Sequence, residues 1–312
     1  MCGIVGYVGS RQAPQVVLQG LKRLEYRGYD SAGVAVLEQN GHIALRRDVG
    51  KLHNLEAMMA SSPLQGHISI GHTRWATHGE PNQRNAHPHI SMNGRVVLVH
   101  NGIVENYAEL REELVAEGIH FESDTDTEVI VQLVERYLES GLDFVTAVCQ
   151  TLPLLRGANA VVIMNTDQPD TLICARLGNA GGITLGLGEE EMFIASDIPA
   201  ILEYTRNMVF LENRQMAVVT RTAFQLSDLE GNPLEPEIHN IAWDPVSAAK
   251  GEYKHFMQKE IFEQPQAIIN TLRGRVDFEH GTVHLPEMNL TPELVNRLQK
   301  IYIVACGTSY YA

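Results

Sequence analysis

Short apolar runs bounded by glycine and polar turn residues recur along the chain, and this pattern predicts β-strands. An Asn40-Gly41 pair between two such runs predicts a hairpin. Strands are expected at residues 3–9, 34–37, 42–46, 96–99, 160–164, 171–175, 183–187, 192–195, 216–220, 224–226 and 301–305, with a further strand beginning at Ile68.

Helical periodicity appears between these runs. Pro14 suits the first turn of a helix, and Val17, Leu21 and Leu24 then share one face, so that a helix ending near Gly28 is expected. Further helices are expected at residues 106–117, 129–139 and 253–272. Strands on either side of a helical middle region predict sheets layered with helices.

A change of composition divides the chain. Residues 235–251 are polar and loop-like, which is typical of a linker. The length of 312 residues also suits two domains better than one. We therefore expect a first domain over residues 2–238, a linker over 239–252 and the start of a second domain over 253–312.

Composition and charge narrow the function classes. With 44% hydrophobic and 20% charged residues, the chain resembles an ordinary soluble protein. A formal net charge of −14 argues against partners such as nucleic acid or an anionic membrane, because phosphate would be repelled. No apolar run approaches the ~20 residues of a membrane-spanning helix, and no signal peptide is recognisable.

The four cysteines are scattered and form no CxxC pair or disulfide framework. Cys149 and Cys174 lie among apolar residues and are expected to be small core residues. Together with the absence of a targeting pattern, this cysteine usage predicts a reduced, cytoplasmic protein.

Cys2 is the first candidate for chemistry, because removal of Met1 would make it the amino-terminal residue. It would then carry a thiol nucleophile and a free α-amine whose reference pKa is about 7.7–8.0. Such an amine is a recognised base for activating a nucleophile. Gly3 allows close approach of the backbone, and the strand that follows would hold the terminus in place. The alternative is a frayed end without function.

The strand that begins at Ile68 runs into a polar loop containing Arg74, Trp75, Thr77 and His78. Functional groups on a loop at the end of a strand are typical of a site. For Trp75, packing in the core is the alternative. Five histidines lie in or near this region: His72, His78, His87, His89 and His100. They are expected to form a hydrogen-bonding scaffold rather than a metal site, because no carboxylate or cysteine stands at ligand spacing among them.

Two further segments have both a structural and a functional interpretation. The Asn101-Gly102 pair either makes a turn or offers a side-chain amide and a backbone N–H to an oxyanion. In residues 123–128, Asp124 or Thr125 suits the N-cap of the next helix, while Asp126 would point into a cleft. Both interpretations of this second segment can hold together.

These motifs together resemble the class II glutamine amidotransferases, which belong to the N-terminal-nucleophile hydrolase group. The motifs are Cys2-Gly3-Ile4-Val5-Gly6, Thr73-Arg74-Trp75-Ala76-Thr77-His78-Gly79, His100-Asn101-Gly102 and Asp124-Thr125-Asp126-Thr127. The resemblance implies an α+β fold, a four-layer αββα sandwich. Residues 25–33, 85–89, 257–265 and 306–309 are similar to the subfamily that transfers the amide nitrogen of glutamine to fructose 6-phosphate, giving glucosamine 6-phosphate and glutamate.

The resemblance also implies catalytic roles without any cofactor. Cys2 would attack the γ-carboxamide of L-glutamine, and the Asn101 side chain and the Gly102 N–H would hold the oxyanion.

Other residues are candidates for binding the α-carboxylate and α-ammonium groups of glutamine. Arg74 is suited to the α-carboxylate through its planar fork, and Asp126 to the α-ammonium group. The resemblance adds Thr77 and His78 as contacts to the same head group, and Trp75 on a loop that closes over the site.

The carboxyl-terminal segment resembles the start of a sugar isomerase domain, where Thr308 and Ser309 would begin a phosphate site. The rest of that domain does not follow, so we expect a fragment that acts only as a glutaminase. Fructose 6-phosphate would require the missing half, and a homodimer is expected for the full-length enzyme. Residues 176–181 depart from the family pattern Arg-x-Gly-Ser-Pro-Leu, which leaves the conformation of this loop open.

Two alternative functions are compatible with the sequence. One is an amidotransferase with another acceptor, such as an amidophosphoribosyltransferase or an asparagine synthetase. The other is a catalytically silent module that senses sugar phosphates.

Overall fold

The computed structural model of the chain describes residues 2–242, 253, 255–272, 275–277, 280–283, 285 and 291–305. The chain divides into two compact units, Met1–Gly251 and Glu252–Ala312. Met1, Thr308 and Ser309, which carry sequence-based predictions, lie outside the described residues. None of the helices in the described part of the chain is long and apolar enough to cross a membrane.

The first unit contains an eight-stranded sheet with the strand order β14-β11-β9-β10-β1-β4-β2-β3. Its strands are β1 (Gly3–Gly9), β2 (Ser31–Leu37), β3 (Ile43–Val49), β4 (Ile68–Arg74), β9 (Thr184–Leu187), β10 (Glu191–Ala195), β11 (Asn207–Phe210) and β14 (His239–Asn240). The amino-terminal strand β1 is central and pairs antiparallel with both β4 and β10. Residues 239–240 thus belong to this sheet, although their composition places them in the expected linker.

A second, six-stranded sheet has the order β13-β12-β8-β7-β6-β5. Its strands are β5 (His89–Ile90), β6 (Val96–Gly102), β7 (Asn159–Asn165), β8 (Leu172–Leu177), β12 (Gln215–Val219) and β13 (Phe224–Asp228). The pairing of β6 with β7 continues to Gly102, two residues beyond His100. The Asn101-Gly102 pair is therefore part of a strand, and the turn interpretation is wrong.

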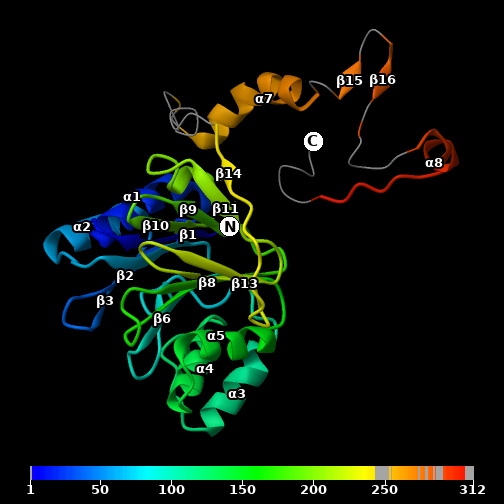
Figure 1. Cartoon of the computed structure of the whole chain (residues 1–312). Helices are drawn as coiled ribbons and strands as arrows, with labels where there is room; N and C mark the ends of the chain where they lie inside the picture. The colour runs from blue at the N-terminus through cyan, green and yellow to red at the C-terminus, as the bar shows by residue number, and fades with distance from the viewer. Residues whose placement is uncertain are drawn as a thin grey trace. The chain divides into compact units, whose positions relative to one another are not determined.

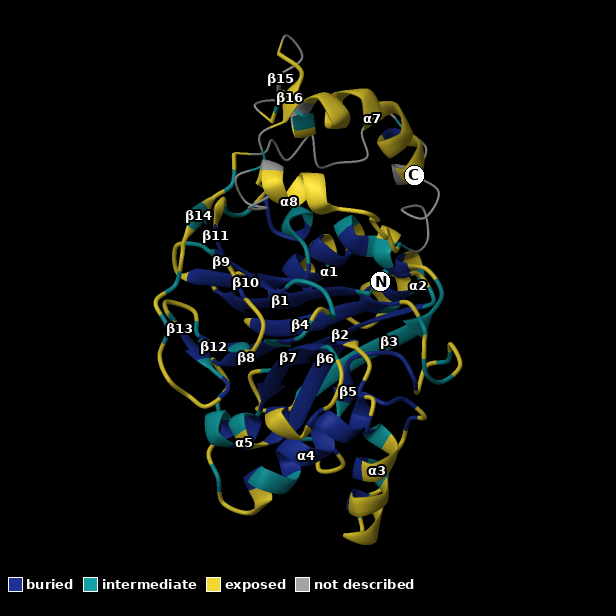
Figure 2. Ribbon diagram, turned by 90° about the vertical axis from the view of Figure 1, so that its right-hand side faces the viewer, coloured by how far each residue is buried: buried dark blue, intermediate teal, exposed yellow. Residues whose placement is uncertain are grey.

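Helices cover the outer faces of the two sheets (Figure 1). They are α1 (Ala13–Leu24), α2 (Leu52–Ser61), α3 (Tyr107–Ala116), α4 (Glu128–Glu139) and α5 (Phe144–Thr151), with short three-ten turns at Glu25–Arg27, Leu152–Leu154 and Ile198–Ala200. In Figure 2, most strands of the two sheets are buried between α1 and α2 on one side and α3, α4 and α5 on the other, whereas β3 at the edge of its sheet is only intermediate in burial. This is the expected four-layer αββα sandwich.

Three apolar clusters hold the layers together. In β1, Ile4 and Val8 face the cluster between the sheets, whereas Val5 and Tyr7 face the cluster under α1 and α2. The strand β6 likewise alternates between the central cluster and the cluster under α3, α4 and α5. Both strands are thus apolar and buried on both faces, which places them in the interior of the unit, and the candidate residues Cys2 and Asn101 lie at their ends.

The second unit contains α7 (Phe256–Leu272), β15 (Val276–Asp277), β16 (Thr282–Val283) and α8 (Pro292–Arg297). The helix expected at 253–272 is confirmed. The buried strand expected at 301–305 is wrong, because these residues have no regular structure and Ile303 and Val304 are at least 90% exposed. An apolar run becomes a strand only beside another strand, and the described residues provide none there.

Candidate active site

Cys2 lies immediately before β1, where the neighbouring Gly3 pairs with Thr73 of β4. The Cys2 Sγ accepts a hydrogen bond from the backbone N–H of Trp75 at 3.1 Å. A Cβ on Gly3 would lie 2.6 Å from Thr73 Oγ1 and 2.8 Å from Leu24 Cβ, so the side chains of these two residues leave no room for a larger residue. These packing constraints hold Cys2 against the loop that follows β4.

The Cys2 thiol is partly sheltered from solvent. Burial raises the pKa of this thiol, while the Trp75 N–H bond and the nearby Arg74 charge act to lower it. A thiol with a raised pKa is mostly protonated near neutral pH, so a nucleophilic role requires a base to remove its proton.

Arg74, the last residue of β4, is only 4% exposed. Its Nη2 donates to the backbone carbonyls of His78 and Gly79, whereas its Nη1 is buried and has no hydrogen-bond partner among the described residues. An unpaired buried donor costs about 1–3 kcal/mol, and more when it is charged. The guanidinium therefore presents an unused donor that an incoming carboxylate can satisfy.

Asp126 is also 4% exposed, and its Oδ2 accepts the backbone N–H of Val104 at 2.8 Å. Its negative charge acts on Arg74, opposing the lowering of the Arg74 pKa that burial causes. The site thus contains a buried cation and a buried anion beside the same thiol.

Two cavities meet at Cys2. A small one is lined by Cys2, Arg74, Trp75, Thr77, His87, His100, Gly102, Asp126 and Thr127. A larger one of about 410 Å³ is lined by Cys2, Arg27, Trp75, Thr77, Asn101, Gly102, Ile103, Glu105, Ala158, Ala180 and Gly181. Seven of the ten predicted site residues, Cys2 included, therefore line these two cavities. Of the remaining three, His78 contacts the site through its backbone carbonyl, which accepts a hydrogen bond from Arg74. Thr308 and Ser309 lie outside the described residues.

Asn101 is held in a fixed orientation at the end of β6. Its Oδ1 lies 3.0 Å from His72 Nε2, and its Nδ2 donates to the Cys2 carbonyl at 3.2 Å. Because Nδ2 points toward Cys2, the amide presents its donor side to the residue that carries the thiol.

Gly102 occupies a backbone conformation that only glycine adopts easily, with φ of +133°, and a Cβ at this position would lie 2.1 Å from the carbonyl oxygen of Ala158. We expect Gly102→Ala to lower the free energy of unfolding of the first unit by at least roughly 1–3 kcal/mol, the cost of backbone strain alone. Urea denaturation followed by circular dichroism measures this loss. Gly94→Ala is the matched control, because its φ is also positive at +74° but nothing lies within 4 Å. Equal losses in both variants would contradict the role of crowding.

The buried histidines form a hydrogen-bonding scaffold, as expected. His100 bonds Thr127 and Asn159 through its two ring nitrogens, and His89 bonds Thr125. Burial lowers the pKa of His72 to about 3 and also lowers that of His100, so both are neutral at pH 7. No group of three or more metal-ligating side chains is found among the residues that the structure describes.

Trp75 is 45% exposed and makes an edge contact with Tyr29 at a ring separation of 5.6 Å. The core-packing alternative for Trp75 is therefore wrong. The loop is tethered beside it, where the Ala76 N–H donates to Asp30 Oδ2 at 2.8 Å. Asp30 was not among the predicted site residues, although it lies in the glycine-punctuated segment 25–33 that carries part of the family resemblance.

The N-cap interpretation of Asp124 and Thr125 is also wrong. The helix α4 begins at Glu128 with Thr127 at the N-cap, and no side chain caps it. Instead, the Glu128 carboxylate turns back and accepts the backbone N–H groups of Glu122 and Ser123 at 2.9 and 2.7 Å. This buried carboxylate fixes the turn that leads to Asp126.

Comparison with known proteins gives relatives over the whole chain. The model of the glutamine amidotransferase domain family matches residues 58–241. The glutamine–fructose-6-phosphate aminotransferases of Caldanaerobacter subterraneus subsp. tengcongensis and Clostridium perfringens are 46% and 47% identical over 312 residues, 100% of this chain and 50% of each relative. The chain thus spans about half the length of the curated relatives it matches.

Solved structures share the fold. Glutamine phosphoribosylpyrophosphate amidotransferase from B. subtilis matches with a TM-score of 0.64 at 25% identity, over 74% of this chain and 50% of that one. A structure described as the allosteric regulatory enzyme of purine biosynthesis matches with a TM-score of 0.65 at 26% identity and the same coverage. The two-sheet sandwich is therefore that of N-terminal-nucleophile amidotransferases.

Proposed function

This chain belongs to the glutamine amidotransferase family, and from that premise we propose that it hydrolyses L-glutamine to glutamate and ammonia with Cys2 as the nucleophile. The observation that carries the proposal is the grouping of the Cys2 thiol with a buried guanidinium donor of Arg74 and the buried carboxylate of Asp126 around one pocket. A zwitterionic amino acid with a side-chain amide complements this arrangement of charges.

In the proposed reaction, Met1 is removed and the new α-amine of Cys2 takes the thiol proton, directly or through a water molecule. The sulfur attacks the γ-carboxamide carbon, and the negative charge that forms on the oxygen is held by Asn101 Nδ2 and the Gly102 N–H. One such donor is typically worth about 2.7–4 kcal/mol of barrier. Ammonia leaves with the proton returned by the amine, and water then hydrolyses the γ-glutamyl thioester.

The head group is held on the other side of the pocket. The unpaired Nη1 of Arg74 donates to the α-carboxylate, and Asp126 binds the α-ammonium group. Thr77 and His78 supply further contacts, and the exposed Trp75 closes over the bound amino acid.

For the whole protein we propose transfer of the ammonia to fructose 6-phosphate, which yields glucosamine 6-phosphate. The support is the named activity of relatives that match over the full length of this chain at 46–47% identity. Acceptors of the amidophosphoribosyltransferase type are less well supported, since the corresponding structure matches at 25% identity over 74% of the chain. A cytoplasmic location and a homodimer of the full-length protein stay predictions.

Mass spectrometry of the purified chain tests the proposed function directly. We expect the intact mass to show loss of Met1, and 6-diazo-5-oxo-L-norleucine, a glutamine analogue, to add once to Cys2 with loss of dinitrogen. With glutamine and fructose 6-phosphate we expect ammonia and glutamate but no amino sugar from this chain. Retained Met1 in protein that releases ammonia would overturn the base assignment, and an unlabelled Cys2 would favour the silent sensor.

A further inference from the structure

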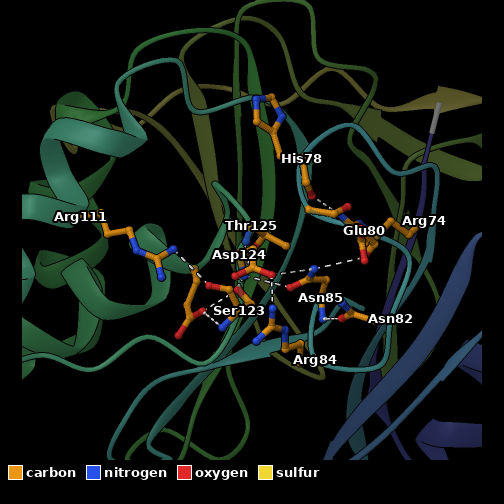
Figure 3. Close-up of polar contacts among 12 residues, drawn as sticks. Arg74, His78, Glu80, Asn82, Arg84, Asn85, Arg111, Ser123, Asp124 and Thr125 are labelled. Carbon is orange, nitrogen blue, oxygen red and sulfur yellow. Dashed lines mark hydrogen bonds and ion pairs between the residues drawn. The ribbon is translucent and has the colours of Figure 1, made fainter.

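The two charged residues proposed to bind the head group, Arg74 and Asp126, lie in segments that belong to different sheet layers. Arg74 is followed by the loop 75–85, which leaves β4 of the eight-stranded sheet, whereas Asp126 lies in the turn before α4, which covers the six-stranded sheet. Figure 3 shows that these two segments meet around Asp124. A contact at this junction therefore links the loop that follows Arg74 with the turn that contains Asp126.

Asn85 makes this junction and is fully buried. Its Oδ1 accepts the backbone N–H of Asp124 at 2.9 Å, and its Nδ2 donates to the backbone carbonyl of Glu80 at 3.1 Å. Its own N–H donates to Asn82 Oδ1 at 2.9 Å. One side chain therefore links the main chain of the Arg74 loop to the main chain of the turn that carries Asp126.

The Asn85 side chain is closely packed and has little room to move. A Cβ on Gly79, whose φ is +75°, would lie 2.7 Å from Asn85 Nδ2. The Gly79 carbonyl in turn accepts a hydrogen bond from Arg74 Nη2 at 3.4 Å. Gly79 thus contacts both the Arg74 guanidinium, through its carbonyl, and the Asn85 side chain, through close packing.

A second link between the loops is exposed to solvent. Arg84 forms an ion pair with the Asp124 carboxylate, and their side chains are 59% and 51% exposed. Exposed ion pairs contribute little because solvent screens them. A buried hydrogen bond whose loss leaves a main-chain N–H unsatisfied contributes more.

We infer that Asn85 is a positioning residue that sets the spacing of Arg74 and Asp126 and so determines the preference of the site for a substrate with both an α-carboxylate and an α-ammonium group. This inference rests on the proposed function. Asn85 touches neither of the two charged side chains in any contact that the structure describes, and it acts through the backbone on each side.

The test compares L-glutamine with two amides that each lack one charge, glutaramate without the α-ammonium and 4-aminobutanamide without the α-carboxylate. For Asn85→Ala we expect kcat/KM for glutamine to fall by about tenfold or more, mainly through KM, because the two charges no longer match one ligand. The two analogues use only one charge, so their kcat/KM should change less than threefold. The preference for glutamine should therefore fall by about the same factor as its kcat/KM.

Arg84→Gln is the matched control on the same loop, and its preference for glutamine should stay within twofold of the parent. Alkylation of Cys2 by iodoacetamide, which needs no head group, should proceed at the parent rate in both variants. If Asn85→Ala does not fold, Asn85→Asp is measured instead, because it keeps the size and the acceptor but places a carboxylate oxygen near the Glu80 carbonyl and Asp124.

Equal losses for glutamine and both analogues, or a slowed alkylation, would show a general structural role and overturn the inference. An unchanged preference in Asn85→Ala would overturn it as well. If the parent chain released no ammonia from glutamine, the proposed function itself would fail, an outcome that the parent measurement reveals before any variant is compared.

Discussion

Replacing Cys2 with alanine is expected to abolish ammonia release from glutamine, with kcat reduced by roughly 10⁴-fold or more, because the variant has no nucleophile to form the thioester. Cys2→Ser tests the same point with a group of similar shape, and we expect it to be almost as inactive because a hydroxyl is much less nucleophilic than a thiol. Single-turnover measurement of ammonia and glutamate gives both rates.

Binding of glutamine should survive this change. The proposed head-group residues Arg74 and Asp126 line the same pocket as Cys2, but their hydrogen bonds to the His78 carbonyl and the Val104 N–H do not involve the sulfur. Isothermal titration of Cys2→Ala with glutamine is therefore expected to give a dissociation constant within a few-fold of the parent KM.

Cys149→Ala is the control for thiol chemistry elsewhere, since Cys149 is half-buried in α5 and packs against the helical core. It should retain full activity. Turnover by Cys2→Ala at the parent rate, or inactivity of Cys149→Ala, would contradict the assignment of the nucleophile.

The central strands could be predicted from the sequence because burial on both faces leaves an uninterrupted apolar run. β1 and β6 are of this kind, and they place Cys2 and Asn101 at their ends. The strand predicted at 301–305 was wrong because an apolar run gives only a preference for strand structure, and the described residues provide no partner strand for it.

Short or weakly patterned elements were missed. β14 has only two residues, too few for alternation to be recognised, and in β11 two buried residues lie between two exposed ones, which is not an alternating pattern. The helix α2 was also missed, although Leu52, Leu55 and Met59 are its buried residues and follow helical spacing. In α2 the helical spacing of apolar residues was present in the sequence, but it consisted of only three positions.

The grouping of Cys2 and Arg74 around one pocket could be predicted, because each residue lies at the end of a recognisable strand and has a distinctive side chain. The candidate site was not predictable where function depends on contacts between loops. The Asn85 side chain accepts a hydrogen bond from the backbone N–H of Asp124, 39 positions away in the sequence. A pattern of neighbouring residues cannot predict such a contact. The N-cap prediction failed for a local reason, because the Glu128 carboxylate bonds the backbone N–H groups of Glu122 and Ser123, six and five residues earlier, in place of a cap on the helix.

Asp126→Asn is expected to raise the KM for glutamine while leaving kcat within a few-fold. Loss of one partner from a buried, hydrogen-bonded charge pair costs roughly 2–5 kcal/mol, which corresponds to about 30- to 5,000-fold in KM. Asparagine keeps an oxygen that can accept the Val104 N–H, so the turn should retain its shape. The charge that attracts the α-ammonium group is removed, and the Cys2 thiol is unchanged.

The matched control is Asp124→Asn, which removes the same charge two residues away. Asp124 is 51% exposed at its side chain, which pairs with Arg84 and accepts a long hydrogen bond of 3.5 Å from Asn85 Nδ2. The shorter bond to Asn85, at 2.9 Å, is made by the backbone N–H of Asp124, which the substitution keeps. We therefore expect its KM to stay within about twofold of the parent, because an exposed ion pair is worth at most ~1 kcal/mol and does not face the substrate. A raised KM in Asp124→Asn with a normal KM in Asp126→Asn would reverse the two roles. A fall in kcat without a change in KM for Asp126→Asn would place its carboxylate in the chemical step, since uniform binding energy alters KM alone.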